Sequence, residues 1–270
     1  MALQTYESIS HDLKSNVGVV PGETIILHSS FKSLGKIEGG AETFIKAVCD
    51  VLTPEGTLLM PSFSHPTEDR YFDMLTMPSR TGYITEVFRR LPDSIRSQHP
   101  THSVCAWGKR ASEFVAGHEN TSAIGKDSPF HKAAKAGARV IMVGCDFRSL
   151  SLVHVSEAIV RVPYLGKVFY KDGDVTLTLR KDDGSEVKVP GFDKPLDSEG
   201  FSRLQDYMEE KRKIEKSKVG LATTLYCSAA EVLSNAVALL KENSGYFLCD
   251  SPSCPVCPKC KEIIGFTLKR

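Results

Sequence analysis

The sequence predicts an α/β fold with a mostly parallel central sheet, helices on both of its faces and an antiparallel β-meander, in a three-layer α/β/α-like arrangement. Short apolar runs rich in β-branched residues, at 24–28, 57–61 and 139–143, alternate with stretches of helical periodicity. Between 166 and 190 the β-like runs instead follow one another, separated by Lys171-Asp172-Gly173 and Asp182-Asp183-Gly184. Asp-Gly between such runs is a strong hairpin signal, so this part is expected to be the meander.

Length and composition limit the class of protein. The chain has 270 residues, 41% of them hydrophobic, which is enough for a sizeable core. A net charge of +1 provides no basic surface for non-specific nucleic-acid binding. No apolar run approaches the ~20 residues that span a bilayer, and MALQTYESISHDLKS lacks the pattern of a secretory signal. We expect a cytoplasmic protein without nucleic-acid or membrane partners, built as one α/β domain over 1–248 and a cysteine-rich tail over 249–270.

The N-terminal part contains a candidate anion site. A polar amphipathic helix is expected over 6–16, followed by the buried strand 24–28. The small polar loop 29–35 then leads into a helix, AETFIKAVCDVLTPE, and the strand 57–61. Free backbone N–H groups at such a helix start suit a phosphate or a developing oxyanion, although many βα turns with Ser and Gly bind nothing.

The next part of the chain contains a polar cluster. A loop over 64–80 and a short helix over 81–90 precede a strand over 103–107, and helices are expected over 109–117 and 128–137. Beside that strand lie Arg96, His99, His102 and Ser103. Taken alone, a histidine in this cluster is most simply a hydrogen-bonded loop residue.

The stretch 138–164 carries the clearest sign of chemistry. A buried strand over 139–143 turns at Gly144, and helical spacing then runs from about Ser149 to Pro163. His154 and Glu157 are three residues apart and therefore lie on one side of that helix. A carboxylate so placed fixes the imidazole tautomer and stabilises the imidazolium, which makes the pair a candidate general base. A half-buried, hydrogen-bonded histidine explains the same spacing.

The C-terminal third returns to alternating elements. A charged helix is expected over 200–217 and a strand over 219–225. An amphipathic helix over 228–243 follows, with Ser228 as its candidate N-cap.

Four ordered segments resemble the aminoglycoside 3-N-acetyltransferase family, the antibiotic N-acetyltransferases. They are LHSSFKSLGKIEGG, RSQHPTHSVCAWG, GKDSPF and GCDFRSLSLVHVSEAIVRVPY, and the likeness spans about 23–164. The family pattern in the last segment, roughly G-x-D/G-…-T/S-x-x-H-x-x-E, is matched by Ser151, His154 and Glu157. The resemblance implies acyl transfer from acetyl-CoA or another acyl-CoA to a primary amine, with these three as catalytic residues.

The resemblance also implies where the coenzyme lies. The family's first loop cradles the pantetheine and phosphates of coenzyme A, and its counterpart here contains His28, Ser29, Ser30, Ser33, Leu34 and Gly35. His99 and Ser103 match the family's coenzyme-side wall, whereas His102 falls where the family varies and receives no role.

These assignments give His154 the task of deprotonating the amine and Glu157 that of holding the imidazole. Ser151 would orient the substrate or complete an oxyanion hole. Its rival role is the nucleophile of a Ser-His-Glu triad, which would make the protein a thioester hydrolase.

The expected acceptor is a small-molecule amine. The loop 64–80 holds Glu68, Asp69 and Asp73 against Arg70 and Arg80, which is a poor lining for a polycation. We therefore expect an amino sugar, free or nucleotide-linked, ahead of an aminoglycoside, with Asp73 and Asp146 as substrate residues. The sequence leaves the oligomeric state open, with a homodimer as one expectation.

The tail contains four cysteines with the spacing C-x4-C-x2-C-x2-C, namely Cys249, Cys254, Cys257 and Cys260. In a cytosolic chain such spacing favours a metal over disulfides. Four thiolates close a tetrahedral shell, so a structural zinc ion is expected, with an iron–sulfur cluster as the runner-up. An ordinary, reducible tail is the simpler alternative.

Overall fold

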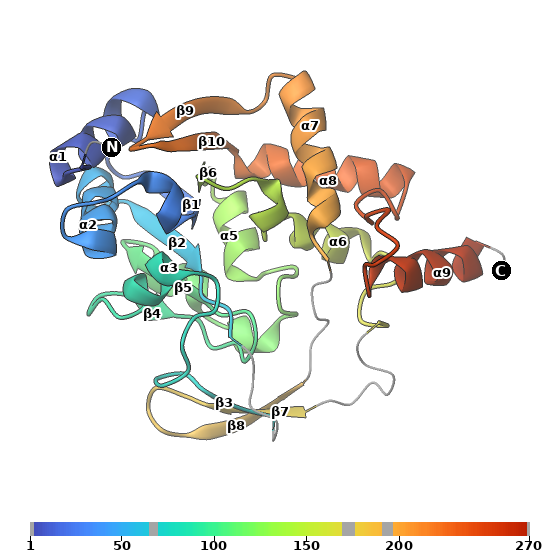
Figure 1. Ribbon diagram of the computed structural model, residues 1–270. Coiled ribbons are helices and arrows are strands. Elements are labelled where there is room, and N and C mark those ends of the chain that lie inside the picture. The colour runs from blue at the N-terminus through green and yellow to red at the C-terminus, as the bar shows by residue number, and fades with distance from the viewer. Residues whose placement is uncertain (1–2, 65–69, 169–175, 191–196, 269–270) are drawn as a thin grey trace.

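The computed structural model describes residues 3–64, 70–168, 176–190 and 197–268. Its central sheet has seven strands in the order β4-β5-β2-β1-β6-β10-β9 (Figure 1). Their bounds are β1 Thr24–Ser29, β2 Thr57–Pro61, β4 Ile95–Arg96, β5 Val104–Gly108, β6 Arg139–Val143, β9 Glu215–Val219 and β10 Ala222–Ser228. The three central strands, β2, β1 and β6, run parallel, and the outer pairings are antiparallel. The predicted α/β class is confirmed, with the parallel part confined to the middle of the sheet.

The apolar runs predicted as strands are buried on both faces of this sheet. Ile26 of β1 lies opposite Leu59 of β2 on one side and Val140 of β6 on the other. Ile26 faces one hydrophobic cluster, whereas its neighbours Ile25 and Leu27 face the other. This alternation explains why the runs are apolar throughout, as strands covered on both faces must be.

Helices cover both faces, as predicted for a three-layer fold. One face packs against α1 (Tyr6–His11), α2 (Gly40–Leu52) and α3 (Tyr83–Phe88). The other face packs against α4 (Ala111–Val115), α5 (Pro129–Lys135), α6 (Val153–Val160), α7 (Ser202–Glu210) and α8 (Ala229–Glu242). Ser228 caps α8 as predicted, because its side chain accepts a hydrogen bond from the backbone of Glu231.

A second, three-stranded sheet lies at the edge of the molecule (Figure 1). The predicted hairpin at 182–184 joins β7 (Thr176–Arg180) to β8 (Glu186–Pro190). The third strand is β3 (Tyr71–Asp73), which pairs in parallel with β7 and comes from the segment predicted as a loop over 64–80. The predicted turn at 171–173 lies outside the described residues. A strand of three residues is too short to show a periodic pattern in the sequence, so β3 is recognised only from its pairing with β7.

The helix predicted over 200–217 is too long. It ends at Glu210, and residues 215–219 form the edge strand β9, which pairs with β10. The run Glu215-Lys216-Ser217-Lys218 is mostly exposed, as charged edge strands are. A run of charged residues is also typical of the exposed face of a helix, which is why the sequence predicted a helix here. The run forms a strand because it pairs with β10.

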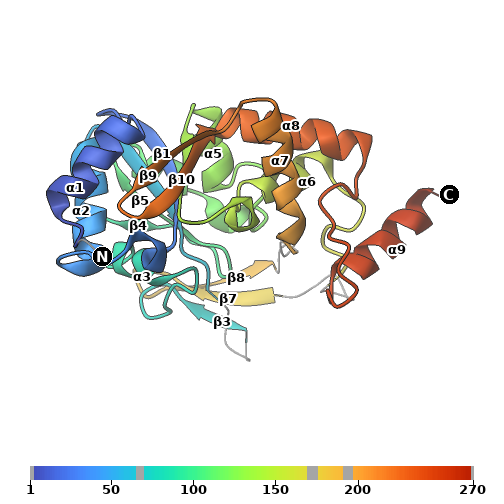
Figure 2. The same ribbon diagram turned by 45° about the horizontal axis from the view of Figure 1, so that its top comes forward.

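The C-terminal tail packs against the body of the protein. Cys249, Val256, Cys257 and Cys260 belong to the hydrophobic cluster that also contains residues of α6 and α8. From Cys257 the chain forms α9 (Cys257–Leu268), which extends to one side (Figure 2). The division into a domain over 1–248 and a tail remains a prediction. In the described part of the chain, no helix combines the length and apolar character needed to cross a bilayer.

Arg96 of β4 connects the two sheets. Its guanidinium donates to the carbonyl oxygens of Met74 at 3.3 Å and Met77 at 2.7 Å, which follow β3. It also lies over the Phe72 ring of β3, 5.2 Å from the ring centroid. Its other acceptors, at the end of β2 and beside β5, are the Ser62 carbonyl and the hydroxyls of Ser64 and Ser103.

We expect Arg96→Met to lower the free energy of unfolding by about 2–4 kcal/mol, because several sheltered acceptors lose their donor. Urea unfolding followed by far-UV circular dichroism measures the change. Arg110→Met is the matched control, since among the described residues this guanidinium contacts its own helix, Glu113 at 2.7 Å and the Phe114 ring at 4.6 Å, and its unfolding curve should stay close to wild type. An Arg96→Met protein as stable as wild type would contradict the connecting role.

Candidate active site

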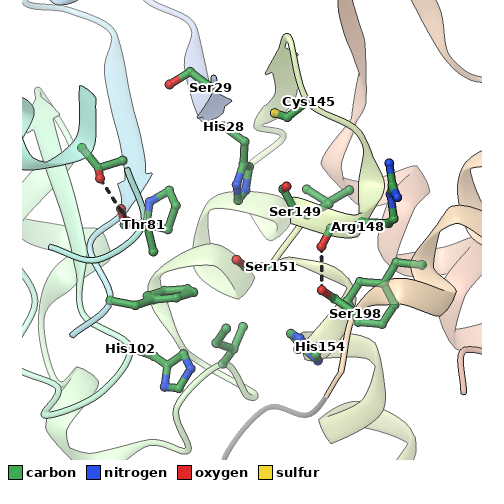
Figure 3. A pocket seen from close by; sticks show the side chains of 16 residues that line it. His28, Ser29, Thr81, His102, Cys145, Arg148, Ser149, Ser151, His154 and Ser198 are labelled. Atoms are coloured by element: carbon green, nitrogen blue, oxygen red, sulfur yellow. Dashed lines mark hydrogen bonds between the residues drawn. The ribbon is translucent and has the colours of Figure 1, made fainter. Parts of the chain in front are cut away.

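A pocket of about 350 Å³ opens where the parallel strands β1, β2 and β6 end (Figure 3). Open α/β sheets bind ligands at this carboxyl edge. The side chains that line the pocket come from distant segments: His28, Ser29, Pro61, Phe63, Thr81, Thr85, His102, Ile124, Cys145, Arg148, Ser149, Leu150, Ser151, His154, Ser198 and Phe201.

His154 and Glu157 are in direct contact on α6. Nδ1 of His154 lies 2.6 Å from Oε2 of Glu157, and the Tyr164 hydroxyl donates to Oε1 of Glu157 at 2.9 Å. All three residues are buried. Burial, with Glu157 as a second cause, raises the pKa of Tyr164, so its hydroxyl keeps the proton that it donates.

This arrangement fixes the state of the imidazole. Because a carboxylate only accepts hydrogen bonds, we assign the imidazole hydrogen to Nδ1, which places the lone pair of the ring on Nε2. The Phe201 ring packs edge-on against His154, 4.7 Å between centroids, and restricts the ring's orientation. An imidazole held in one tautomer beside a pocket is equipped to accept a proton from a bound group.

Ser151 lines the same pocket one helical turn before His154. Among the described residues, its hydroxyl makes no hydrogen bond with the His154 ring; the two residues are joined through their backbones, by the His154 N–H to the Ser151 carbonyl at 3.1 Å. An activated serine nucleophile lies within hydrogen-bond reach of its base. The geometry therefore favours an orienting serine over a triad nucleophile.

His28, at the end of β1, points into the pocket (Figure 3). It is 4% exposed, and its Nε2 has no hydrogen-bond partner among the described residues. Burial lowers the pKa of His28 to about 4, so the ring is neutral at pH 7. A buried polar atom without a partner beside a cavity is a natural point of contact for a ligand.

Only the start of the loop predicted to hold the coenzyme reaches the pocket. His28 and Ser29 line it, whereas Ser33 and Leu34 make their contacts inside the protein. Ser33 donates to the Gly144 carbonyl at 3.2 Å and to the Ser30 hydroxyl at 2.9 Å. Leu34 is buried in the core.

Gly35 packs against the β9–β10 turn. Its φ is +85°, and a Cβ atom there would lie 2.8 Å from the Leu221 side chain. A bulky residue at Gly35 would therefore disturb the fold, so such a variant does not test coenzyme binding cleanly.

Neither predicted wall residue, His99 or Ser103, is among the described residues that line the pocket, whereas His102 is. His99 stacks beside His118 at 4.6 Å, and Ser103 bonds to the Ser62 carbonyl at 2.7 Å. His102 packs against Phe63 at 4.6 Å, and both line the pocket. A histidine in a polar cluster gives no local sign of which ring faces a cavity.

Neither predicted substrate carboxylate is among the described residues that line the pocket. Asp73 caps the turn after β3 and pairs with Arg180 at 3.2 Å. Asp146 pairs with Arg148 at 2.6 Å. Glu68 and Asp69 lie outside the described residues. Arg148, which no sequence pattern singled out, lines the pocket instead, together with Thr81 and Ser198.

Three of the four tail cysteines converge with an aspartate. One ligand atom from each of Asp197, Cys249, Cys254 and Cys257 lies within 4.8 Å of the others. Cys260 is outside that group and is buried on α9. Burial, with Glu157 as the next cause, raises the pKa of Cys260 to about 12. The sequence around Asp197 gives no sign that this residue lies beside the tail cysteines.

Comparison with known proteins identifies the family. The model of the aminoglycoside 3-N-acetyltransferase family matches residues 26–241. The SPbeta prophage-derived aminoglycoside N(3')-acetyltransferase-like protein YokD of Bacillus subtilis is 30% identical over 256 residues, covering 86% of this chain and 91% of that protein. Aminoglycoside N(3)-acetyltransferase III of Serratia marcescens is 27% identical, covering 90% and 99%.

Solved structures agree with this result. A mutant of aminoglycoside acetyltransferase AAC(3)-IVa in complex with a gentamicin is similar with a TM-score of 0.84 and 25% identity, covering 97% of this chain and 98% of that one. The structure of YokD gives a TM-score of 0.78 at 27% identity, covering 90% and 96%. The chain therefore belongs to the aminoglycoside 3-N-acetyltransferase family, whose members are acyl-CoA-dependent N-acyltransferases.

Proposed function

We propose that the protein transfers an acetyl group from acetyl-CoA to a primary amine of an amino sugar, with His154 as the general base. The observation that carries this proposal is the buried pair of His154 and Glu157, 2.6 Å apart, beside the pocket at the sheet edge. Family membership supplies the reaction class, and this pair supplies the group that the reaction needs.

The amine reaches the site as an ammonium and must lose a proton before it attacks. Nε2 of His154 accepts that proton, and Glu157 stabilises the resulting imidazolium. The neutral amine then forms a C–N bond to the thioester carbonyl carbon, and the C–S bond breaks to release the coenzyme A thiolate. After the attack the nitrogen carries one proton too many and gives it to the thiolate, while the imidazolium releases its proton to solvent, which restores the base and leaves an amide, a free thiol and one proton.

The thioester oxygen gains negative charge during the attack and needs a donor. We assign this role to His28, because its neutral ring lines the pocket and Nε2 lacks a partner in the described part of the protein. A hydrogen on Nε2 would point toward the ligand and act as an oxyanion donor. Ser151 is the second candidate donor, or it orients the amine.

Thioester hydrolysis by a Ser-His-Glu triad is less well supported. In the described part of the chain, the Ser151 hydroxyl and the His154 ring are not hydrogen-bonded, and an amine attacks a thioester without a covalent intermediate.

Two observations bear on the identity of the acceptor amine, and they favour different amines. The curated relatives are named for aminoglycosides, and AAC(3)-IVa has been solved with a gentamicin. The described residues that line this pocket, however, include no carboxylate and do include Arg148. Polycations are normally bound by carboxylates, so the lining favours an acceptor with fewer amines, including one attached to an anionic nucleotide.

We also propose a homodimer, a cytoplasmic location and a structural zinc ion in the tail. No step of the proposed reaction passes through the metal.

His154→Gln should lower kcat by at least ~10²-fold, because glutamine cannot accept the proton, while coenzyme A still binds. Release of the coenzyme thiol measures turnover, and calorimetry measures binding. Glu157→Gln should lose less, since it orients the base and exchanges no proton with the amine. Near-normal turnover by a folded His154→Gln protein would rule out this base.

His28→Phe should lower kcat by ~10²-fold with little change in the KM for acetyl-CoA, as expected when an oxyanion donor is lost. Phenylalanine keeps the ring volume beside Phe130 and removes the nitrogen. His28→Gln, which retains an N–H donor, should recover part of the rate. Equal rates for the Phe and Gln variants would contradict the donor role.

A panel of amines should reveal the acceptor. At equal concentration, kcat/KM should be higher for a singly aminated sugar, free or nucleotide-linked, than for gentamicin or apramycin. Arg148→Ala should reduce this preference, because it removes a cationic side chain from the pocket and leaves its partner Asp146 without a counter-charge. Faster turnover of the aminoglycosides would contradict the preference. Thioester loss without any amine, at the rate seen with one, would support the hydrolase instead.

A further inference from the structure

We propose that Asp197, Cys249, Cys254 and Cys257 bind one zinc ion, and that this ion fastens the C-terminal tail to the segment forming one wall of the pocket. The four residues come from two distant parts of the chain, Asp197 before α7 and the cysteines after α8. This site lies outside the proposed catalytic groups and does not depend on the proposed reaction.

The ligand atoms have the spacing that a tetrahedral ion requires. With Zn–S bonds near 2.3 Å and Zn–O bonds near 2.0 Å, tetrahedral geometry places sulfur and oxygen ligands about 3.5 Å apart. Oδ2 of Asp197 lies 3.3 Å from the Cys257 sulfur and 3.7 Å from the Cys254 sulfur. Since Cys249 completes the group within 4.8 Å, three sulfurs and one oxygen can close a four-coordinate shell.

Backbone N–H groups already point at two of the sulfurs. The Cys257 N–H donates to the Cys254 sulfur at 3.4 Å, and the Cys249 N–H donates to the Cys257 sulfur at 3.3 Å. Such donors stabilise thiolates and hold metal ligands in place. Both N–H groups belong to the tail itself, so the tail's own backbone prepares the site.

Cations next to the site offset its charge. Three thiolates and a carboxylate around a divalent ion leave an excess of negative charge. Lys261 donates to the Cys249 carbonyl at 2.8 Å and pairs with Asp250 at 2.8 Å. Arg203 of α7 donates to the Leu248 carbonyl at 3.0 Å and pairs with Asp250 at 2.5 Å.

The close spacing favours one ion over an iron–sulfur cluster. A cluster separates its cysteine ligands by several iron and sulfide atoms, which a group within 4.8 Å does not allow. Cys260, the fourth cysteine of the sequence pattern, is outside the group within 4.8 Å; it is buried and interacts electrostatically with Glu157 and Tyr164 as well as with Cys254 and Asp197. The ligand set therefore differs from the four cysteines that the spacing predicts.

The ion would connect the tail to the pocket. Ser198, next to Asp197, lines the pocket and donates to the Arg148 carbonyl at 2.6 Å. Phe201 packs on His154, and Phe247, two residues before Cys249, packs on Phe201 at 5.6 Å. The metal would thus hold together the two segments between which these aromatic rings pack. The backbone of these segments, α7 and the chain between α8 and α9, can be followed in Figure 2.

Elemental analysis of the full chain, purified without chelator, should find about one zinc ion per chain. Asp197→Ala and the double variant Cys254→Ser/Cys257→Ser should each lose most of it. Two matched controls should keep it: Glu199→Ala, which removes an exposed carboxylate from the same segment, and Cys260→Ala. A wild-type protein without zinc, or with stoichiometric iron, would overturn the proposal. Zinc retained by Asp197→Ala, or lost from a folded Cys260→Ala protein, would overturn the ligand set.

Two measurements on wild type avoid variants that fail to fold. Cobalt(II) exchanged for zinc should give the thiolate charge-transfer absorption of a tetrahedral site with three sulfurs. Removal of zinc by a strong chelator should accelerate proteolytic cleavage within 249–260, because binding orders the tail. Equal cleavage rates with and without zinc would refute the fastening role. Both readouts are independent of acyl transfer, so they stand whether or not the proposed reaction is found.

Discussion

The hydrogen bonds from Tyr164 through Glu157 to His154 are the interaction on which the site depends. A buried carboxylate is costly unless donors satisfy it, and here a hydroxyl and an imidazole supply one bond to each oxygen. The imidazole is thereby oriented before any substrate arrives. For the proposed general base, such preorganisation means that the ring need not reorient during the reaction.

The surroundings of these hydrogen bonds come largely from the C-terminal third of the chain. Phe201 covers the His154 ring, Phe247 covers Phe201, and Cys260 packs near Glu157. Helix α6 also packs closely against α8. The position of the His154 ring thus depends on residues far beyond its own strand–helix unit, and this is why the packing of the tail bears on the pocket.

Family and pocket lining provide different kinds of information about function. Family membership establishes the class of reaction, since it reflects similarity over most of the chain. The residues that line the pocket indicate which acceptor fits, because a polycation and a singly aminated sugar need different complementary charges. Arg148 and the neutral His28 provide no counter-charge for a polycation among the described lining residues.

The sequence by itself determined the elements whose pattern is local: the strands β1, β2 and β6, the flanking helices, the Asp-Gly hairpin at 182–184, and the contact of His154 with Glu157. Burial of one face of a helix or strand gives a periodic pattern of apolar residues in the sequence, and residues three apart on a helix lie close together. Tertiary structure alone decided that β9 is a strand, that His102 rather than His99 lines the pocket, and that Asp197 joins the tail cysteines. These outcomes depend on which distant segments pack together, and local periodicity carries no record of that.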